Sequence, residues 1–180
     1  DQYSLGSHFP DSVGKIRSFW GSVGMLTRAY TYMRAHGAEG LEKISKIAIL
    51  NANYLKEKLK KDYTLAYQRV CMHEFVLTAT ELKQKYGISA TDIGKALLDR
   101  GYHAPTVYFP LIVPEALMIE PTECESKQTL DEFIAAMKDI LQTAKPNPEE
   151  LKNAPVTTPV NRLDEVKAAR ELNLRWRPKA

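Results

Sequence analysis

The sequence predicts an α+β fold in which a small, mostly antiparallel sheet is covered by helices. Segments with helical or strand periodicity follow one another in the order helix, helix, strand, helix, strand, strand, helix, rather than in the strand–helix alternation that builds a parallel sheet. The chain has 180 residues, of which 44% are hydrophobic and 26% charged. This balance is typical of a globular protein with one sizeable core.

Two amphipathic helices are predicted near the start of the chain. From Ser12 to His36, apolar residues recur at steps of three and four, which places them on one face of a helix. A second run with this spacing extends from Leu41 to Leu59. The lysine-rich stretch Lys56–Lys61 is interpreted as a solvated last turn that favours the negative end of the helix dipole. The apolar set of the first helix is Ile16, Phe19, Trp20, Val23, Leu26 and Tyr30.

One strand and one helix are expected in the middle of the chain. Residues 69–79, "RVCMHEFVLTA", are rich in β-branched and aromatic side chains and predict a strand. Residues 91–100 carry a helical pattern with Thr91 as the candidate N-cap. This helix is expected to end before Gly101, because glycine is common just after a helix.

Prolines divide the next apolar run into pieces of strand length. Two strands are expected, over residues 106–110 and 115–121, since Pro110 and Pro114 cannot donate to a sheet ladder. Pro121 ends the second strand. The stretch "ALMI" within it reads as a buried strand because it is uninterrupted and apolar.

A further helix has the clearest pattern in the chain. Its apolar positions repeat from Leu130 to Leu141 at helical spacing. Thr129 and Glu132 match a capping box, in which the two ends of the motif satisfy each other's backbone donors. Pro146 and Pro148 are expected to close this helix.

Composition and charge disfavour several classes of protein. The 25 basic and 22 acidic residues give a net charge of +3 and are spread along the chain, which does not favour nucleic-acid binding. No apolar run reaches the roughly 18 residues that a membrane span needs, and the N-terminus lacks the pattern of a signal peptide. Cys71 and Cys124 have no metal-ligand spacing and form no disulfide framework. We expect a cytoplasmic protein in which both cysteines are small buried side chains.

Five stretches follow one another along the chain: "SVGKIRSFWGSVGMLTRAYTYMRAHGAEGL", "LNANYLKEKL", "CMHEFVLTA", "DRGYHAPTVYFPLIVPEALMIEPTECESKQTLDEFIAAM" and "TTPVNRLDEVKAARELNLRW". In this order they resemble the C-terminal part of glycine decarboxylase, the P-protein of the glycine cleavage system. The resemblance covers almost the whole chain, and "YFPLIVPEALMIEPTE" is closer to subunit 2 of the two-subunit bacterial form than to the long single-chain form.

The resemblance implies a pyridoxal-phosphate enzyme of the aspartate-aminotransferase-like fold, whose large domain holds the cofactor and whose small C-terminal domain closes over it. Glycine would lose its carboxylate as CO2, and its aminomethyl group would pass to the lipoyl arm of the H-protein. Glycine decarboxylase subunit 1 is a further implied partner. The family's Schiff-base lysine follows a histidine, and no His-Lys pair occurs in this sequence. We therefore expect this fragment alone to be inactive and not to retain pyridoxal phosphate.

The same resemblance suggests a division of the chain. Residues 1–36 are expected to form a long helix that leads into the small domain, residues 37–145 the small α+β domain, and residues 146–180 a surface tail with a short helix around 163–170. The alternative to an enzyme fragment is a non-catalytic interaction domain that packs against a cofactor domain or a partner subunit. Removal of a large domain would leave apolar side chains of the first helix exposed, namely Phe19, Trp20 and Tyr30.

Three residues are candidates to face a substrate or cofactor. His73 could supply an imidazole, and strand alternation would place it on one face with Arg69 while Glu74 points to the other. Arg69 could bind a carboxylate through its guanidinium. His103 follows a helix in "GYHAP" and could face the cofactor domain. The alternatives are a core histidine, a solvated arginine and a loop-packing histidine.

No catalytic residue and no metal ligand is expected in this fragment. Thr122 and Glu123 are interpreted as caps of the following helix rather than ligand-binding groups.

Overall fold

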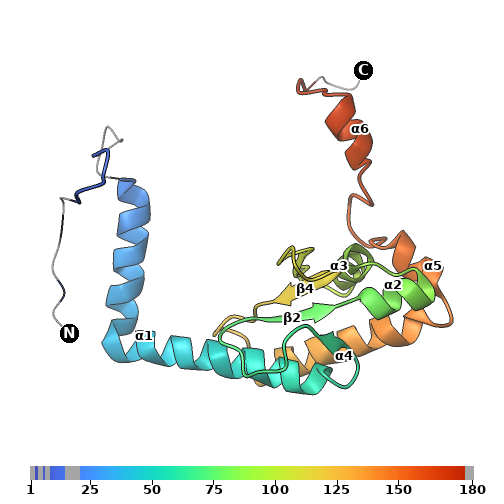
Figure 1. Cartoon of the computed structure of the whole chain (residues 1–180), viewed down its shortest axis with the longest axis horizontal. Helices are drawn as coiled ribbons and strands as arrows, with labels where there is room; N and C mark the ends of the chain where they lie inside the picture. The colour runs from blue at the N-terminus through green and yellow to red at the C-terminus, as the bar shows by residue number, and fades with distance from the viewer. Residues whose placement is uncertain (1–2, 4–5, 7–8, 15–20, 177–180) are drawn as a thin grey trace. The chain divides into compact units, whose positions relative to one another are not determined.

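The computed structural model describes residues 3, 6, 9–14 and 21–176. Backbone contacts separate two compact units, Asp1–Glu42 and Lys43–Ala180. The second unit carries the sheet and helices α2 to α6 (Figure 1). The predicted boundaries after residues 36 and 145 stay predictions.

Helix α1 (Val23–Leu59) is interrupted at Gly37, whose φ of 65° and ψ of −179° are not helical. Glycine adopts a positive φ readily because it has no Cβ. The break falls within "HGAEG", where the sequence predicted the end of one helix and the start of another, and the second helix is confirmed. The first helix begins only at Val23 and not at Ser12, since residues 12–14 and 21–22 are not helical, and residues 15–20 lie outside the described residues. Tyr30 is 61% exposed, whereas Phe19 and Trp20 lie outside the described residues.

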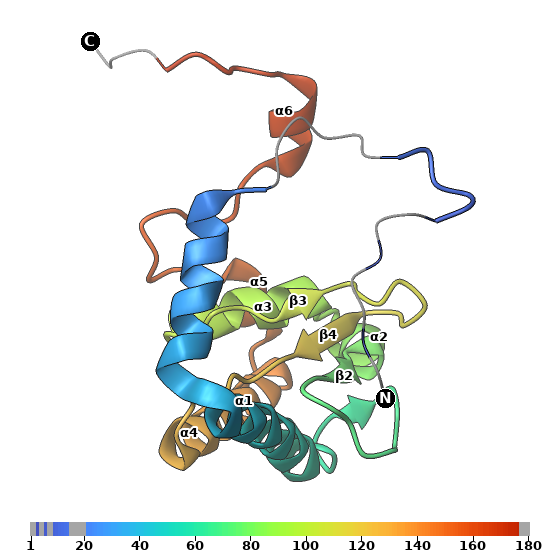
Figure 2. The ribbon, with the colours of Figure 1, turned by 90° about the vertical axis from the view of Figure 1, so that its left-hand side faces the viewer.

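The sheet consists of four short strands in the order β1-β2-β4-β3, and all neighbours are antiparallel. This arrangement confirms the predicted α+β fold with its small antiparallel sheet. In the second unit, helix α4 lies beside the second half of α1 on one side of the sheet (Figures 1 and 2). The strands are β1 (Thr64–Leu65), β2 (Phe75–Thr78), β3 (Thr106–Val107) and β4 (Ala116–Ile119).

The core lies between one face of the sheet and the helices. Leu77 and Leu117 are paired across β2 and β4 and are fully buried. Paired residues share a face of the sheet, so both side chains point into the same layer. The helices that cover them are the second half of α1, α3 (Ala90–Asp99) and α4 (Lys127–Ala144), which contribute Leu55, Leu59, Ile93, Leu97, Met137 and Ile140.

Serine side chains cap α3 and α4. The Ser89 hydroxyl accepts a hydrogen bond from the Asp92 backbone N–H, and the Asp92 carboxylate accepts one from the Ser89 N–H. The predicted cap at Thr91 is therefore wrong, because the helix begins before that residue. The Ser126 hydroxyl accepts from the Thr129 N–H. The predicted capping box starting at Thr129 is wrong for the same reason.

Several short elements differ from the prediction. The strand predicted over residues 69–79 is limited to β2, while residues 69–74 form an irregular loop. Helix α2 (Thr80–Tyr86) follows that strand directly and was not predicted. Pro148 does not close a helix but begins α5 (Pro148–Asn153), where its fixed φ suits the first turn. Helix α6 (Glu165–Arg170) matches the predicted short helix.

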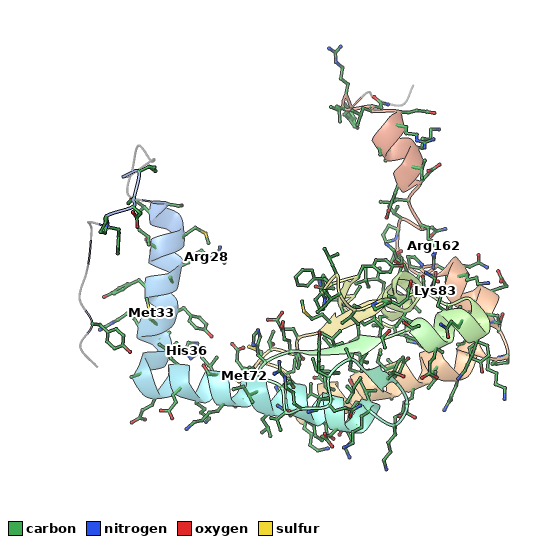
Figure 3. The ribbon with its side chains drawn as sticks, in the orientation of Figure 1. Arg28, Met33, His36, Met72, Lys83 and Arg162 are labelled. Carbon is green, nitrogen blue, oxygen red and sulfur yellow. The ribbon has the colours of Figure 1, made fainter. Side chains whose placement is uncertain are left out.

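The segment after α5 is tied to helix α3. The Asp99 carboxylate accepts hydrogen bonds from the Thr157 N–H at 2.8 Å and from the Thr157 hydroxyl at 2.7 Å. Arg162 Nη2 lies 2.6 Å from Asp92 Oδ1, and Figure 3 shows Arg162 where the chain passes α3. The segment is thus anchored as far as Arg162, and residues 163–176 are exposed.

Candidate functional site

The last turns of α1 hold two loops through hydrogen bonds to loop backbone. Asn51 Nδ2 donates to the carbonyl oxygen of Thr122 at 2.9 Å, in the connection from β4 to α4. Asn53 Nδ2 donates to the Cys71 carbonyl at 2.7 Å, and Asn53 Oδ1 accepts from the Cys71 N–H at 3.1 Å. A side-chain amide can satisfy a donor and an acceptor together. The β1–β2 loop (residues 66–74) is therefore fixed against the same helix as the other connection.

Lys56 adds a third tie and corrects the interpretation of the lysine run. Its side chain is only 3% exposed, and its Nζ donates to the carbonyl oxygen of Arg69 at 2.9 Å. Glu57 Oε1 lies 3.9 Å from the same nitrogen. The prediction of a solvated Lys56 is wrong because position 56 is one helical turn from buried Ala52, on the face that packs inward.

A cleft of about 560 Å³ lies between the segment before β3 and the segment after β4. Leu55, Leu130 and Phe133 form its apolar part. The candidate residue His103 lines the cleft and is exposed. The polar side chains that line it are Tyr102, His103, Thr106, Glu120, Thr122, Glu125 and Thr129.

His73 does not line this cleft, but it lies next to the Glu120 carboxylate, which does. Its Nε2 lies 3.6 Å from Glu120 Oε1 and 3.9 Å from Glu74 Oε2, and its side chain is 54% exposed. The expected divergence of His73 and Glu74 is wrong, because the strand begins only at Phe75 and alternation does not apply to the loop before it.

Arg69 is not brought to the cleft. It is exposed in the β1–β2 loop, and its backbone carbonyl is the group that Lys56 binds.

Thr122 is not a helix cap, since α4 begins at Lys127. The Thr122 hydroxyl instead accepts a hydrogen bond from the Cys124 N–H at 3.3 Å. Glu123 also precedes the helix by several residues, so the capping role predicted for this pair is wrong.

The two cysteines differ in environment. Cys71 is half-buried, and burial raises the pKa of its thiol, partly offset by the charge of Lys56. A raised pKa keeps the thiol protonated and unreactive at neutral pH. Cys124 is exposed, so the prediction of two buried cysteines is wrong for Cys124.

Glu120 and Asn53 were not named from the sequence, and Lys56 was named only as part of a solvated run. For Asn53 and Lys56 the sequence did carry a signal, because both are polar residues within a helix that also carries core positions such as Leu55. Glu120 carried a weaker signal. It follows β4 directly, and its partner His73 lies 47 positions earlier in the chain, by the numbering. Only the pairing of β2 with β4 brings the two together.

The cleft does not fit pyridoxal phosphate on its own. An imine with the cofactor needs a lysine amine at the site, and within the described residues no lysine lines the cleft. The buried amine of Lys56 is engaged by the Arg69 carbonyl. Glu120 and Glu125 place negative charge where a phosphate would have to bind, which is unfavourable. What the cleft offers is the carboxylates of Glu120 and Glu125 and the imidazole of His103, which could bind a cation or exchange a proton.

Residues 44–161 match the family described as "Glycine dehydrogenase, C-terminal domain". The α+β unit therefore belongs to a class of enzyme C-terminal domains. The chain belongs to this family, and the resemblance seen in the sequence is confirmed. None of the helices in the described part of the chain has the length and apolar character that a bilayer crossing demands.

Curated relatives are similar along nearly the whole chain. A protein of Chlorobaculum tepidum, named "Probable glycine dehydrogenase (decarboxylating) subunit 2", is 54% identical over 173 residues, covering 96% of this chain and 36% of the relative. A protein of the same name from Fervidobacterium nodosum is 54% identical over 170 residues, covering 94% and 36%. One from Coxiella burnetii is 55% identical over 171 residues, covering 94% and 35%. The chain therefore spans about a third of the length of these relatives.

Proposed function

We propose that this chain forms the small C-terminal domain of a two-subunit glycine decarboxylase that uses pyridoxal phosphate. The complete enzyme would release the glycine carboxylate as CO2 and pass the aminomethyl group to the lipoyl arm of the H-protein. Glycine decarboxylase subunit 1 would be its partner, in the cytoplasm. The observation that carries the proposal is the family match over residues 44–161, supported by relatives whose names include "(decarboxylating) subunit 2".

Within that enzyme, we assign the cleft to the side of the domain that meets the cofactor-binding part. His73 and His103 are the candidate residues that face substrate, and Glu120 joins them because its carboxylate lies 3.6 Å from His73. Carboxylates and imidazoles suit an amino-acid substrate, since they attract an ammonium group and exchange protons near neutral pH. Arg69 stays a weaker candidate. Both it and His73 lie on the β1–β2 loop outside the cleft lining, but His73 is linked to the cleft by Glu120, whereas Arg69 is exposed.

Pyridoxal phosphate, when bound, supplies the electron sink for decarboxylation. We assign its binding to a part of the enzyme outside these residues, for which the poor fit of the cleft is the support. Addition of the cofactor to the isolated chain tests this assignment. We expect no stoichiometric imine absorbance and no lysine adduct after borohydride reduction. A specific reducible adduct on one lysine of this chain would contradict the assignment.

The proposed activity is tested by exchange of labelled bicarbonate into the glycine carboxylate, with subunit 1, H-protein and the complete subunit 2. We expect His103→Ala and Glu120→Gln to reduce exchange by about a hundredfold or more, the lower end of what a general acid or base contributes at a reacting site. Glu132→Gln is the matched control, because Glu132 is an exposed carboxylate of α4 outside the cleft. Equal activity of all three variants would remove the cleft from the site.

A non-catalytic interaction domain is the second candidate function. The observation that favours it is the cleft without a suitable lysine among the described residues. The two candidates differ in one measurement. Cleft variants of an interaction domain would change assembly with subunit 1 but not exchange in the assembled enzyme, whereas cleft variants of a substrate-facing domain would change exchange at full assembly.

A further inference from the structure

The contact between His73 and Glu120 lies beyond the end of the ladder that joins β2 to β4. The last pair of that ladder is Phe75 with Ile119, so the sheet stops one residue short of Glu120 and two residues short of His73. Continuation of the register would set Glu74 directly opposite Glu120, and like charges opposite each other are unfavourable in a sheet. The sheet therefore does not fix this contact.

The side chains of His73 and Glu120 do not hold their two segments together by themselves. His73 Nε2 lies 3.6 Å from Glu120 Oε1, and the side chains are 54% and 57% exposed. A contact between exposed polar side chains contributes little, because water competes for both groups. The separation of the pair must therefore be set by backbone contacts of the two segments.

Asn53 fixes the segment that leads to His73. Asn53 Oδ1 accepts a hydrogen bond from the Cys71 N–H at 3.1 Å, and Asn53 Nδ2 donates to the Cys71 carbonyl at 2.7 Å. Two bonds to the backbone of one residue fix the direction of the chain as well as its position, just before His73. A side-chain amide supplies the donor and the acceptor that this requires, whereas a carboxylate lacks the donor.

Asn51 fixes the segment that follows Glu120. It is 7% exposed, and its Nδ2 donates to the Thr122 carbonyl at 2.9 Å and lies 3.5 Å from the Glu125 carbonyl oxygen. Loss of such a partner would leave a buried polar group unsatisfied, which is costly. Positions 51 and 53 are about 200° apart around a helix. The two amides therefore reach different segments from one helix.

We propose that Asn51 and Asn53 are positioning residues of the enzyme, which set the geometry of the His73–Glu120 pair. Neither asparagine lines the cleft. Each would therefore influence the reaction through the segment it holds and not by contact with substrate. The inference rests on the proposed function, in which His73 and Glu120 face the substrate.

A double-mutant cycle tests the inference, with labelled bicarbonate exchange by the complete subunit 2, subunit 1 and H-protein. We expect Asn51→Ala and Asn53→Ala each to lower the rate by about tenfold or more, since misplacement of a reacting group by about 1 Å can cost a hundredfold. In a Glu120→Gln background, either substitution should change the rate by less than about twofold, because residues that act as a unit are not additive. Losses that multiply fully with that of Glu120→Gln would overturn the proposal.

Tyr63→Phe is the matched control for stability. It also removes a buried side-chain bond to a backbone carbonyl, that of Met137, but neither residue lines the cleft. This variant should leave exchange unchanged at a temperature where circular dichroism shows all variants folded. A loss as large as that of Asn53→Ala would identify general destabilisation as the cause and contradict the proposal. If Asn51→Ala does not fold, Asn53→Ala at a half-buried position still carries the test.

A spectroscopic measurement on the complete subunit 2 is independent of activity. The ring signals of isotope-labelled His73, assigned by their absence from His73→Ala, should shift on Glu120→Gln, because a charged oxygen near the imidazole becomes part of a neutral amide. In an Asn53→Ala background the same replacement should leave these signals unchanged, since the imidazole would no longer lie against residue 120. An equal shift in both backgrounds would show that Asn53 does not set the contact.

Failure of this inference is distinguishable from failure of the proposed function. If the wild-type enzyme exchanges label but the losses of Asn53→Ala and Glu120→Gln multiply, the positioning inference alone is wrong. If the His73 signals respond as expected but the wild-type enzyme shows no exchange with H-protein and cofactor present, the proposed activity is wrong, and with it the role of the asparagines in the reaction.

Discussion

Replacement of Asp92 by asparagine tests the link between helix α3 and the segment that ends at Arg162. The Asp92 carboxylate accepts hydrogen bonds from the Ser89 N–H at 2.8 Å and from the Ser89 hydroxyl at 2.6 Å. Its other oxygen lies 2.6 Å from Arg162 Nη2. Asparagine has nearly the same shape, but the NH2 group of its amide is a hydrogen-bond donor. That group would face either Ser89 or Arg162, which are themselves donors at this site.

The expected loss follows from the contacts. A hydrogen bond to a charged group contributes about 1.5–3 kcal/mol, and a helix cap about 0.5–2 kcal/mol. The pair with Arg162 is discounted because the arginine side chain is 36% exposed. We expect Asp92→Asn to lower the free energy of unfolding by about 2–3 kcal/mol. For a chain of this size the melting temperature should fall by roughly 4–12 °C.

The effect should depend on pH. Burial alone would raise the pKa of Asp92, but the hydrogen bonds from Ser89 and the charge of Arg162 outweigh it and hold the pKa below its ordinary value of 3.8. A carboxyl group with a lower pKa in the folded state stabilises the fold above its unfolded pKa, and this contribution is lost as the pH falls through the folded pKa. The difference between wild type and variant should therefore shrink below about pH 4.

Urea unfolding followed by circular dichroism, at neutral pH and in a series toward pH 3, provides the measurement. Asp164→Asn is the matched control, because Asp164 also caps a helix, by accepting from the Lys167 N–H at 2.9 Å, but at an exposed site. Its effect should stay below about 1 kcal/mol. A difference of under about 0.5 kcal/mol for Asp92→Asn, or one that does not vary with pH, would refute the reasoning.

Three further substitutions probe the core and the loop anchors. Met137→Ala should lower the free energy of unfolding by about 2–5 kcal/mol in urea titration, because Met137 is fully buried, whereas Met72→Ala at an exposed site should change it by under about 0.5 kcal/mol. Tyr63→Phe should cost about 1 kcal/mol, since the Tyr63 hydroxyl donates to the Met137 carbonyl at 2.7 Å. Burial raises the pKa of Tyr63 well above its ordinary value of 10. The wild-type protein should therefore lose stability above about pH 10, where the unfolded chain releases this proton first. The same alkaline loss in the phenylalanine variant would contradict this assignment. Asn53→Ala should accelerate hydrogen exchange at the Cys71 amide, and unchanged exchange would show that the loop is held by other contacts.

The long helices could be predicted from the sequence because their apolar periodicity extends over many residues, as it does in α4. Strand β4 could be predicted for another reason, the uninterrupted apolar run "ALMI" between Pro114 and Pro121. Strand β1, with two residues, has no periodicity to read and exists only through its pairing with β2. The serine caps were missed for a different reason. Thr91 and Thr129 are also good cap residues, and only the backbone path determines which neighbouring hydroxyl meets a free N–H.

The candidate site could be predicted only in part. The position of His103 at the cleft could be predicted, because it depends only on the local direction of the chain after α3. The contact between His73 and Glu120 depends on strand pairing, which sequence spacing does not reveal. The inward direction of Lys56 was missed because lysine is rarely buried. Its stem can pack against apolar neighbours while its amine finds a single carbonyl.

The hydrogen bonds from Asn51, Asn53 and Lys56 all end on loop backbone rather than on loop side chains. A helix that recognises backbone is indifferent to the side chains of the loop it holds. Substitutions within the β1–β2 loop can therefore accumulate without loosening its attachment. This leaves the surface around His73 free to be retuned, by evolution or by design, while the scaffold that positions it stays the same.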